Sequence, residues 1–478
     1  MIFGSIPEVS LPKPPASPKM ILCLCPSWGL EMPPIALGVL KTALKAQGVD
    51  LQTRDLNLET WLGLKENSNR DVFWDKSNLH YWTDPKLYAE EMFPELDPLL
   101  ERFSDELSYG PWEYIAFSIM SSTVLFTNQL VERIRLKTPN KVIIAGGPCL
   151  AFHEERQRLR SDFDYFVVGE GEETLKELYS YLECERKSLP QSVYQTRRLG
   201  EDLPFRKMED EARYGVPDYS DMLLSAYQIQ ALPIIFTRSC LFKCRFCADY
   251  KSMGEFRKTS SQRMYENLKS FLDMGYRSFW FNDLLINGIM GELVEVCLRL
   301  ESENYSFEWI ALATPNRQLK IEDLKILARN GLKTLNFGLE SGSPKVMRLM
   351  HKGFNLELAE EGLKRVRDAG INTQLNIIVG FPGETEEDFC LTLEFLSRNR
   401  HNICGFTSVN ACVLLAGSDI SRRPDKYGIL WDENQDMQTQ WYIPGENSPE
   451  IRINRLQRVL EWIEANGYGV YSNNKKSS

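Results

Sequence analysis

Three cysteines lie within eight residues of one another in the stretch RSCLFKCRFCADY, residues 238–250. Cys240, Cys244 and Cys247 have the spacing C-x3-C-x2-C, and no histidine or fourth cysteine follows within reach by sequence. A structural zinc site needs four protein ligands, so this stretch is one ligand short. Three thiolates instead suit a 4Fe-4S cluster whose fourth iron stays open to a substrate or cofactor. The spacing therefore favours an iron-sulfur cluster over zinc.

The composition restricts the class of protein that holds this loop. The chain has 478 residues, of which 43% are hydrophobic and 26% charged, as expected for a globular protein with two main domains. Its net charge of −10 gives no basic footprint for nucleic acid, so no nucleic-acid partner is predicted. No apolar run approaches the roughly 18 residues of a membrane span. The proline-rich start, residues 1–20, lacks a secretory leader, so we expect a tail there and a cytoplasmic protein.

The remaining cysteines do not indicate a disulfide framework. Eleven cysteines is an odd number, and they are scattered along a large chain. Cys23, Cys297 and Cys390 lie in apolar runs, so we expect them to be small core residues.

Residues 21–185 alternate between apolar strands and helical stretches. ILCLCPS leads into PPIALGVLKTALKAQG, in which apolar residues recur at helical spacing. DLQTRDLN follows, then an irregular, aromatic-rich insertion to about residue 110, then the strands YIAFSIMS, KVIIAGG and YFVVGEG. This alternation predicts an α/β, doubly wound, Rossmann-like domain with a parallel sheet. Ligands of such sheets bind at the carboxyl ends of the strands.

A second alternating series follows a proline-containing linker, residues 186–228. Residues 229–420 contain six candidate strands, and helices between them end at Gly275, Gly331 and Gly370. Six βα units are too few for a closed eight-stranded barrel, so we predict a partial (β/α)6 TIM barrel. Residues 421–478 resemble a small, mainly helical C-terminal cap.

The cysteine spacing, with Phe246 before the last cysteine, resembles the signature of radical S-adenosylmethionine (SAM) enzymes. NFGLESGSPKVMRLMHKGFN and NIIVGFPGETEEDF follow in the order that this family shows. The resemblance implies that Cys240, Cys244 and Cys247 hold the 4Fe-4S cluster, whose open iron binds SAM and cleaves it to methionine and a 5′-deoxyadenosyl radical. It further implies that Glu340 and Ser341 contact the ribose or methionine part. Backbone near Phe246 and Gly380 would face the adenine, and an external flavodoxin- or ferredoxin-type protein would supply electrons.

The first domain resembles the cobalamin-binding domain that precedes many of these enzymes. The resemblance rests on the first helix, on AGGP and on VVGEGEETL, and implies cobalamin contacts from Ser121, Gly146, Gly147, Gly169, Glu170 and Gly171. Glycines let backbone approach a bulky ligand closely. Many cobalamin domains carry a cobalt-ligating histidine in the first strand-to-helix loop. Here that loop reads CPSWGLEMPP and has none, so a bound cobalamin would lack a protein histidine below the cobalt.

Two functions remain open at this stage. The favoured one is a cobalamin-dependent radical SAM methyltransferase that methylates an unactivated carbon of its substrate through methylcobalamin. The alternative is a radical SAM cyclase, oxidase or rearrangement enzyme whose first domain does not deliver methyl. A methylthiotransferase is less favoured, because the additional N-terminal cluster cysteines and the basic RNA-binding tail of that branch are not evident.

The substrate is not predicted beyond a small molecule, a lipid or a peptide side chain. Its specificity would come from WDKSNLHYWTDPKLYAEEMFPEL, from the barrel-mouth loops and from the cap. For Trp74, Tyr81 and Trp82, a hydrophobic contact between domains is favoured over packing against substrate.

Overall fold

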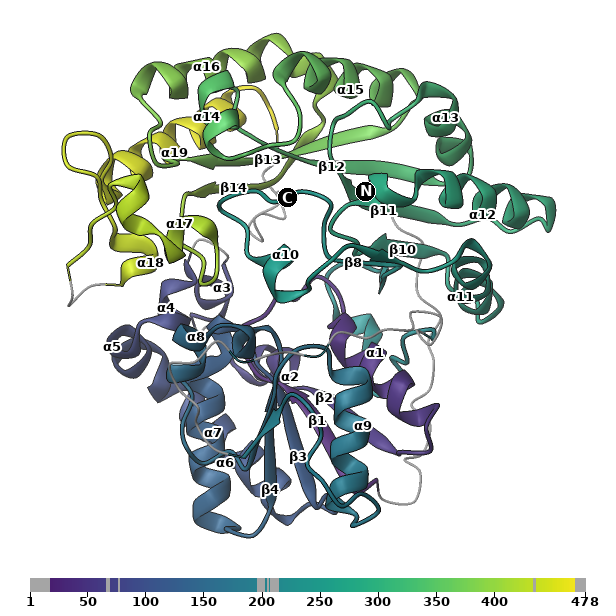
Figure 1. The fold of residues 1–478 in the computed structure, drawn as a ribbon, viewed down its shortest axis with the longest axis vertical. Coiled ribbons are helices and arrows are strands. Elements are labelled where there is room, and N and C mark those ends of the chain that lie inside the picture. Colours follow the sequence, from purple (N-terminus) through teal and green to yellow (C-terminus); the bar gives the residue numbers. More distant parts are fainter. Residues whose placement is uncertain are drawn as a thin grey trace. The chain divides into compact units, whose positions relative to one another are not determined.

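The chain divides into two compact units, and the boundary in the sequence lies between Pro233 and Ile234 (Figure 1). A computed structural model describes residues 18–65, 69–75, 78–195, 203, 206, 215–432 and 436–468. The predicted N-terminal tail, up to residue 17, and much of the predicted linker lie outside these residues. The second unit begins at Ile234, whereas the sequence analysis placed its start at residue 229.

The first unit contains the predicted parallel sheet. Five strands lie in the order β2-β1-β3-β4-β5 and pair in parallel, and a short sixth strand, β6, pairs antiparallel with β5. Their bounds are β1 Met20–Leu24, β2 Leu51–Asp55, β3 Tyr114–Ser118, β4 Val142–Gly146, β5 Tyr165–Val167 and β6 Val193–Tyr194. Every residue of β1 and β3 is buried, because helices cover both faces of the sheet. The doubly wound prediction is confirmed.

Four helices form the two outer layers of this unit. α1 (Ile35–Lys45) and α9 (Gly171–Leu182) lie on one face of the sheet, and α6 (Phe93–Tyr109) and α7 (Val124–Lys137) lie on the other (Figure 1). The arrangement brings the carboxyl ends of the parallel strands to one edge of the sheet, where ligands of doubly wound domains bind.

The insertion before residue 110 is helical where it is described, which corrects the prediction of an irregular segment. It contains α2 (Leu56–Gly63), α3 (Arg70–Phe73), α4 (His80–Thr83), α5 (Pro85–Leu87), a π-helical turn (Tyr88–Met92) and α6. Pro94 lies in the first turn of α6, where a missing N–H costs no hydrogen bond. The sequence of α6 does show apolar residues at helical spacing, and these are buried in the structure: Leu96, Leu99, Leu100, Phe103 and Leu107. The short helices have too few turns to show such a period.

The aromatic residues of this insertion pack inside the first unit. Trp74 and Trp82 are buried, and their rings meet edge to face at 4.9 Å. The Trp74 Nε1–H donates to Asn57 Oδ1 at 2.8 Å and the Trp82 Nε1–H to the Phe73 carbonyl at 2.7 Å. These contacts are internal to the unit, which corrects the prediction of an interdomain role.

The end of the predicted linker, from residue 215, packs on the first unit as a strap. Lys41 Nζ of α1 forms an ion pair with Asp221 at 2.6 Å, and the Tyr227 hydroxyl donates to Asp55 Oδ2 at 2.6 Å. The contacts join the strap to residues 180 and 172 positions away in the chain. The strap therefore belongs to the fold of the first unit.

The second large sheet has six strands in the order β14-β13-β12-β11-β10-β7, as predicted for a partial barrel, and its strand β7 includes the chain boundary between the two units. Their bounds are β7 Leu232–Ile234, β10 Ser278–Phe281, β11 Glu308–Ala313, β12 Leu332–Glu340, β13 Asn372–Val379 and β14 Gly405–Ala411. The pairs from β10 to β14 are parallel. Helices α11 (Ser261–Asp273), α12 (Met290–Ser302), α13 (Ile321–Arg329), α15 (Leu356–Asp368) and α16 (Glu386–Arg398) lie on the outer face (Figure 1).

Glycines end three of these helices as predicted. Gly275, Gly331 and Gly370 follow α11, α13 and α15 with φ values of 94°, 88° and 79°, a conformation that favours glycine.

The first predicted strand of the barrel is broken into two pieces. β7 ends at Ile234, and Thr237–Arg238 forms β8, which pairs antiparallel with β9 (Arg257–Lys258). The Phe236 and Thr237 N–H groups donate to Asp283 Oδ1 at 2.9 and 2.5 Å. The buried Asp283 carboxylate, which follows β10, therefore accepts two N–H groups that would pair with the neighbouring strand if the first strand were continuous.

The region after residue 421 belongs to the second unit. It contains α18 (Met437–Gln440) and α19 (Pro449–Ala465), and α17 (Asp419–Arg422) precedes it. A buried cluster that includes Phe381, Leu414, Ile420 and Trp441 packs this region against the turn after β13. None of the helices in the described part of the chain combines the length and apolar composition that crossing a bilayer requires.

Candidate iron-sulfur and cofactor site

The cysteine loop lies between β8 and α10 (Asp249–Ser252) and is held at both of its sides. Arg245 in the loop donates its backbone N–H to the Met350 carbonyl at 3.0 Å and its guanidinium to the Leu349 carbonyl at 3.0 Å. The Asp419 N–H donates in turn to the Arg245 carbonyl at 3.0 Å. The loop is thus fixed by α14 (Pro344–Leu349) on one side and by α17 on the other.

The three thiols are half-buried, so they are shielded from solvent but not sealed in the core. Burial raises the pKa of all three thiols above its ordinary value. The Phe242 N–H donates to Cys240 Sγ at 3.4 Å, and such a bond stabilises the thiolate. The Cys247 thiol donates to Asp249 Oδ2 at 3.5 Å, and burial raises the pKa of that carboxyl.

The arrangement of the thiols fits a cluster better than a single metal ion. In the described part of the chain, no three Cys, His, Asp or Glu side chains converge closely enough to hold one ion. A 4Fe-4S cube does not require such convergence, because each cysteine binds a different iron. The donor set of three thiols with no fourth ligand on the loop therefore fits a cube with one open iron.

Lys352 is a site residue that the sequence analysis missed. Its side chain is only 7% exposed and lies 3.4 Å from the Glu340 carboxylate, which is 9% exposed. Its charge lowers the pKa of Cys240 and Cys244, opposing the effect of burial. The sequence did offer a signal for this residue, because Lys352 lies in MHKGFN, within a segment that resembles the radical SAM family. Its buried cation offsets the negative charge of the thiolates and of Glu340.

Glu340 and Ser341 lie at the end of β12, but the structure uses them differently. Glu340 is buried, has a φ of 73° and pairs with Lys352, while burial raises the pKa of its carboxyl. The Ser341 hydroxyl is fully buried, accepts the Ser343 N–H at 3.1 Å and lies 3.2 Å from Thr392 Oγ1. Ser341 thus stabilises the turn, which leaves Glu340 as the charged group near the cysteine loop.

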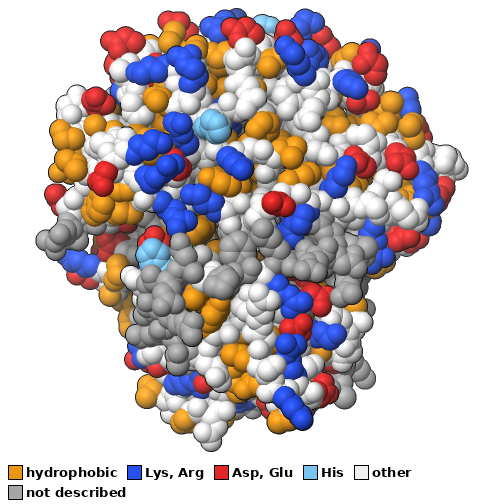
Figure 2. All heavy atoms as spheres, in the orientation of Figure 1, with side chains coloured by type: hydrophobic (Ala, Val, Ile, Leu, Met, Phe, Trp, Pro, Cys, Tyr) orange, Lys and Arg blue, Asp and Glu red, His pale blue; other side chains and the backbone are white. Residues whose placement is uncertain are grey.

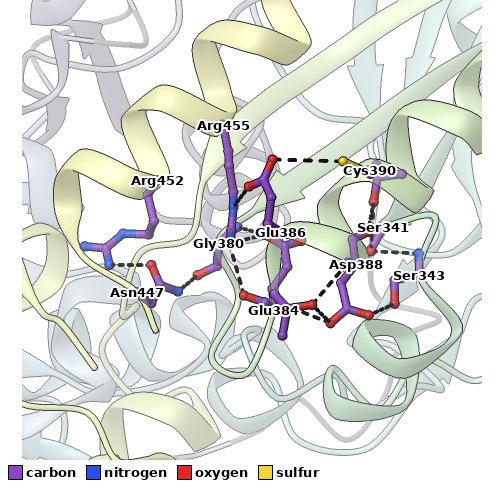
Figure 3. A network of polar contacts seen from close by, with 12 residues as sticks. Ser341, Ser343, Gly380, Glu384, Glu386, Asp388, Cys390, Asn447, Arg452 and Arg455 are labelled. Carbon is purple, nitrogen blue, oxygen red and sulfur yellow. Dashed lines mark hydrogen bonds and ion pairs between the residues drawn. The ribbon is translucent and has the colours of Figure 1, made fainter. Parts of the chain in front are cut away.

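The turn after β13 is fixed by a buried polar network (Figure 3). The Gly380 N–H donates to Glu384 Oε2 at 2.5 Å, and its carbonyl accepts from Asn447 Nδ2 at 2.8 Å. Arg455 of α19 pairs with Glu384 at 3.1 Å, and both side chains are less than 5% exposed. Burial raises the pKa of Glu384 to about 7. Gly380 was predicted to face the adenine. Its backbone N–H and its carbonyl are both hydrogen-bonded within the protein.

Two further sequence predictions can be placed in the second unit. Phe246 is half-buried, packs against the cluster of Phe381 and Ile420, and has Lys352 Nζ 5.6 Å from its ring centre. Cys390 was expected in the core, but it is half-buried on α16 with its Sγ 4.0 Å from Glu386 (Figure 3). Apolar neighbours in sequence could not show that it lies on the outer side of an amphipathic helix.

The face of the barrel sheet opposite the outer helices carries several neutral polar side chains. On the helix side, Phe279 of β10 packs on Phe271 of α11 at 5.8 Å. Strand alternation places polar residues on the other side, together with the apolar Ile310, Leu312 and Ile378: Asn282, Asn336, Gln374, Asn376, Ser408 and Asn410. Among the described residues, Asn336 is fully buried and neither of its amide atoms has a hydrogen-bond partner. A buried amide left unpaired is costly, so this face fits a polar ligand or bound water.

The first unit brings the predicted cobalamin contacts to the carboxyl ends of β3, β4 and β5. Gly146 ends β4, and a Cβ there would meet no atom closer than 3.8 Å. Gly147 has a φ of 104°, and a Cβ there would lie 2.5 Å from the Ile119 nitrogen. Gly147 therefore serves the packing of two loops, whereas a Cβ at Gly146 would make only ordinary van der Waals contacts. The remaining predicted residues follow β3 (Ser121) or β5 (Gly169, Glu170 and Gly171).

The loop after β1 contains no histidine and is held by Asn57. The Asn57 Oδ1 accepts the Trp28 N–H at 2.9 Å, and the Trp28 side chain remains 44% exposed. His153 begins α8 (His153–Gln157), is 34% exposed and lies 3.2 Å from Glu154, as predicted for a surface helix residue. The loop after β1 thus offers an exposed indole and no imidazole.

Comparison with known protein families agrees with both halves of this description. Residues 234–396 match the radical SAM superfamily, and residues 95–179 match the B12 binding domain. The chain is thus a B12 binding domain joined to a radical SAM domain. These domains identify its cofactors as a 4Fe-4S cluster, SAM and cobalamin.

Individual relatives share about a quarter of their residues with the chain. It is 26% identical over 329 residues to an uncharacterized methyltransferase of Pyrococcus horikoshii, which covers 67% of this chain and 70% of that protein. It is 24% identical over 328 residues to a putative methylthiotransferase of Methanocaldococcus jannaschii, covering 65% and 69%. The radical SAM methyltransferase TsrM from Kitasatospora setae has the same fold, with a TM-score of 0.67 at 14% identity over 94% of this chain and 89% of TsrM.

Proposed function

We propose that the protein is a cobalamin-dependent radical SAM C-methyltransferase that acts on an unactivated carbon of its substrate. The observation that supports this most is the presence in one chain of a three-cysteine loop in a radical SAM domain and of a B12 binding domain. When bound, the cluster with SAM supplies hydrogen-atom abstraction, and cobalamin supplies a methyl group. The similarity to the uncharacterized methyltransferase of Pyrococcus horikoshii and the fold shared with TsrM support the same proposal.

The residues of the chain would hold and isolate these groups. Cys240, Cys244 and Cys247 would ligate three irons. Lys352 would offset the negative charge of the thiolates and keep Glu340 ionised for a ribose or amino group of SAM. The Glu384–Arg455 pair would keep the turn at Gly380 rigid beside the nucleoside. Rigid placement matters because a carbon radical reacts with whatever group it meets first.

The polar sheet face supports a substrate with uncharged polar groups. Its polar side chains include amides and hydroxyls, and the Glu340 carboxylate is already paired with Lys352. An amide such as Asn336 can both donate and accept, so an amide, lactam or hydroxyl of the substrate would satisfy it. A strongly charged substrate would lack a counter-ion on this face.

Similarity to a putative methylthiotransferase favours that alternative function. The described cysteines of the first unit oppose it, because they do not form a cluster site. Cys23, Cys25 and Cys149 are buried in that unit, where burial raises the pKa of their thiols, and Cys184 is exposed and apart from them in sequence. Buried apolar thiols are poor ligands for a second cluster. We therefore retain the methyltransferase, with a radical cyclase or oxidase as the alternative.

Isotope transfer tests the proposal. Each methyl transfer should consume two SAM molecules and release S-adenosylhomocysteine and 5′-deoxyadenosine in near-equal amounts. Deuterium at the target carbon should move into 5′-deoxyadenosine, and label from the SAM methyl should enter the product. Deuterium transfer without methyl incorporation would support the cyclase or oxidase instead. Methyl incorporation without 5′-deoxyadenosine would indicate polar transfer to a nucleophilic carbon.

A further inference from the structure

The surface around the cysteine loop is basic, although the whole chain has a net charge of −10. Three segments form it: residues 239–251, 344–353 and 418–428. Together they contain nine Lys or Arg residues and three Asp or Glu residues. Two of the nine, Lys345 and the buried Lys352, are paired with Asp388 and Glu340 outside these segments. Figure 2 shows Lys and Arg side chains gathered on the face over α14 and α17. We call this surface the basic patch.

Backbone contacts bring the three segments together. Arg245, between the second and third cysteines, is bonded to Met350 of the second segment and to Asp419 of the third. His351 Nδ1 lies 3.2 Å from the Lys243 carbonyl. Positive residues of all three segments therefore lie near the cluster loop.

Several cations of the patch are available to a partner. Lys243, Arg348 and Lys426 are exposed, and no ion pair joins them to another described residue. The acidic Asp419 is occupied by Arg423 and by the Tyr427 hydroxyl. Burial and then the charges of Arg422 and Arg423 lower the pKa of Lys251, which marks a locally positive field. Leu241, inside the cysteine loop, is 48% exposed and offers an apolar contact within the basic rim.

We propose that the basic patch is the docking surface of a small acidic electron-carrier protein. The inference rests on the cluster assignment and does not depend on the methyl transfer. A radical SAM centre must receive one electron before each SAM cleavage. The carrier's reduced flavin or iron-sulfur group would lose that electron and the cluster would gain it, with no bond made or broken during docking. Positive charge around the loop steers an acidic partner to the point of transfer and raises the rate of encounter.

An acidic protein suits this surface better than RNA. The chain as a whole has a net charge of −10, so a long phosphate backbone that extends beyond the patch would meet a surface of net negative charge. A protein carrier of a few nanometres can contact the patch alone and can cover Leu241. RNA binding is therefore treated as an alternative outcome of the test.

The charge-reversal variant Arg348→Glu/Lys426→Glu tests the proposal, because neither residue lies on the cysteine loop. Binding of a purified acidic flavodoxin to the iron-loaded chain would be measured by fluorescence anisotropy in 50 mM NaCl. We expect Kd to rise about tenfold in this variant. The control variant Lys320→Glu/Lys325→Glu makes the same change of charge at exposed positions beside and on α13, and should keep the wild-type Kd. An equal loss in both variants would overturn the proposal.

Activity separates docking from chemistry. With flavodoxin as the reductant, formation of 5′-deoxyadenosine by Arg348→Glu/Lys426→Glu should fall about tenfold at subsaturating carrier. With dithionite, which needs no docking surface, the rate and the iron content should match the wild type. Failure of the methyltransferase proposal would leave this result unchanged, because SAM cleavage is measured without product analysis.

A measurement on the unaltered protein does not depend on the folding of any variant. The Kd for flavodoxin should rise steeply between 50 and 300 mM NaCl, because exposed charges are screened over about 10 Å at 0.1 M salt. A Kd that does not change with salt would exclude electrostatic docking. Tight binding of a transfer RNA that is lost in Arg348→Glu/Lys426→Glu, with no flavodoxin binding, would assign the patch to RNA.

Discussion

At the scale of single residues, the chain separates cysteines that bind from cysteines that pack. The cluster cysteines lie on an anchored loop and are half-buried, whereas Cys23 and Cys297 are buried in the cores of the two units, as predicted. Cys390 belongs to neither group, because it is half-buried at the surface of α16. The difference lies in the local surroundings of each thiol.

Replacing Cys240, Cys244 and Cys247 by Ala should abolish iron binding and SAM cleavage, because each thiol ligates one iron of the cube. Iron content and 5′-deoxyadenosine formation are the measurements. Cys390→Ala should keep the iron and change the free energy of unfolding by less than about 0.5 kcal/mol, as surface substitutions do. A triple variant that retains the iron would refute the assignment.

Asp283 should make the stability of the chain depend on pH. Burial raises the pKa of this carboxyl to about 6, although hydrogen bonds from Phe236 and Thr237 lower it. The Asp283 Oδ2 has no hydrogen-bond partner among the described residues. Because the folded pKa exceeds the unfolded one, its contribution is full below about pH 4 and is lost as the pH rises through 6.

The sign can be measured on the iron-free chain. Asn at position 283 keeps the acceptor for both N–H groups and cannot ionise. Asp283→Asn should therefore be more stable relative to the wild type at pH 7.5 than at pH 4.5, by up to about 3 kcal/mol. Urea unfolding at the two pH values gives the comparison, and parallel pH profiles would contradict it.

At the level of helices and strands, the glycines that end helices differ in how closely other atoms surround them. Gly331 and Gly370 both have positive φ values after a helix. A Cβ at Gly331 would lie 1.8 Å from the Phe307 carbonyl oxygen, whereas a Cβ at Gly370 would meet nothing within 4 Å. The first glycine is required by its surroundings, and the second only by its own backbone.

Gly370→Ala should cost about 1–2 kcal/mol, the strain of a left-handed alanine. Gly331→Ala should cost more, because a carbonyl in the neighbouring strand connection must also move. Urea midpoints of the two variants test this order. Equal midpoints would show that the Phe307 carbonyl moves without penalty.

α19 should depend on its buried ion pair. Arg455→Met leaves the Glu384 carboxylate buried without its cation, which costs about 3–5 kcal/mol. Arg458 on the same helix pairs with Glu386 at the surface, so Arg458→Met should cost at most about 1 kcal/mol. Adding Glu384→Gln to Arg455→Met should recover part of the loss. Equal losses in the two arginine variants would contradict the role of burial.

At the scale of the whole molecule, two units of similar architecture place their functional loops at strand ends. The first unit offers loops after β3, β4 and β5, and the second offers the cysteine loop and the ends of β12 and β13. All four histidines lie in the described part of the chain, and none lies in the loop after β1. This distribution has a spectroscopic consequence.

Purified protein supplied with hydroxocobalamin should retain it through gel filtration and show the absorption spectrum of a base-off species. The reason is that the loop after β1 offers no imidazole for the lower face of cobalt. His153→Ala should leave the spectrum unchanged. A nitrogen-ligated spectrum that is lost in His153→Ala would show that this surface histidine becomes a ligand.

The parallel sheets, the glycine helix ends and the three-cysteine loop could be predicted from the sequence, because each is encoded by contiguous residues. Strand alternation, helix-ending glycines and ligand spacing are local patterns. Which residues from other segments serve the site became visible only in the folded chain. Lys352 reaches Glu340 and acts on the thiols, and Arg455 meets Glu384 across 71 positions. The helical insertion, the surface position of Cys390 and the break after β7 also depend on packing between distant segments, which no local pattern contains.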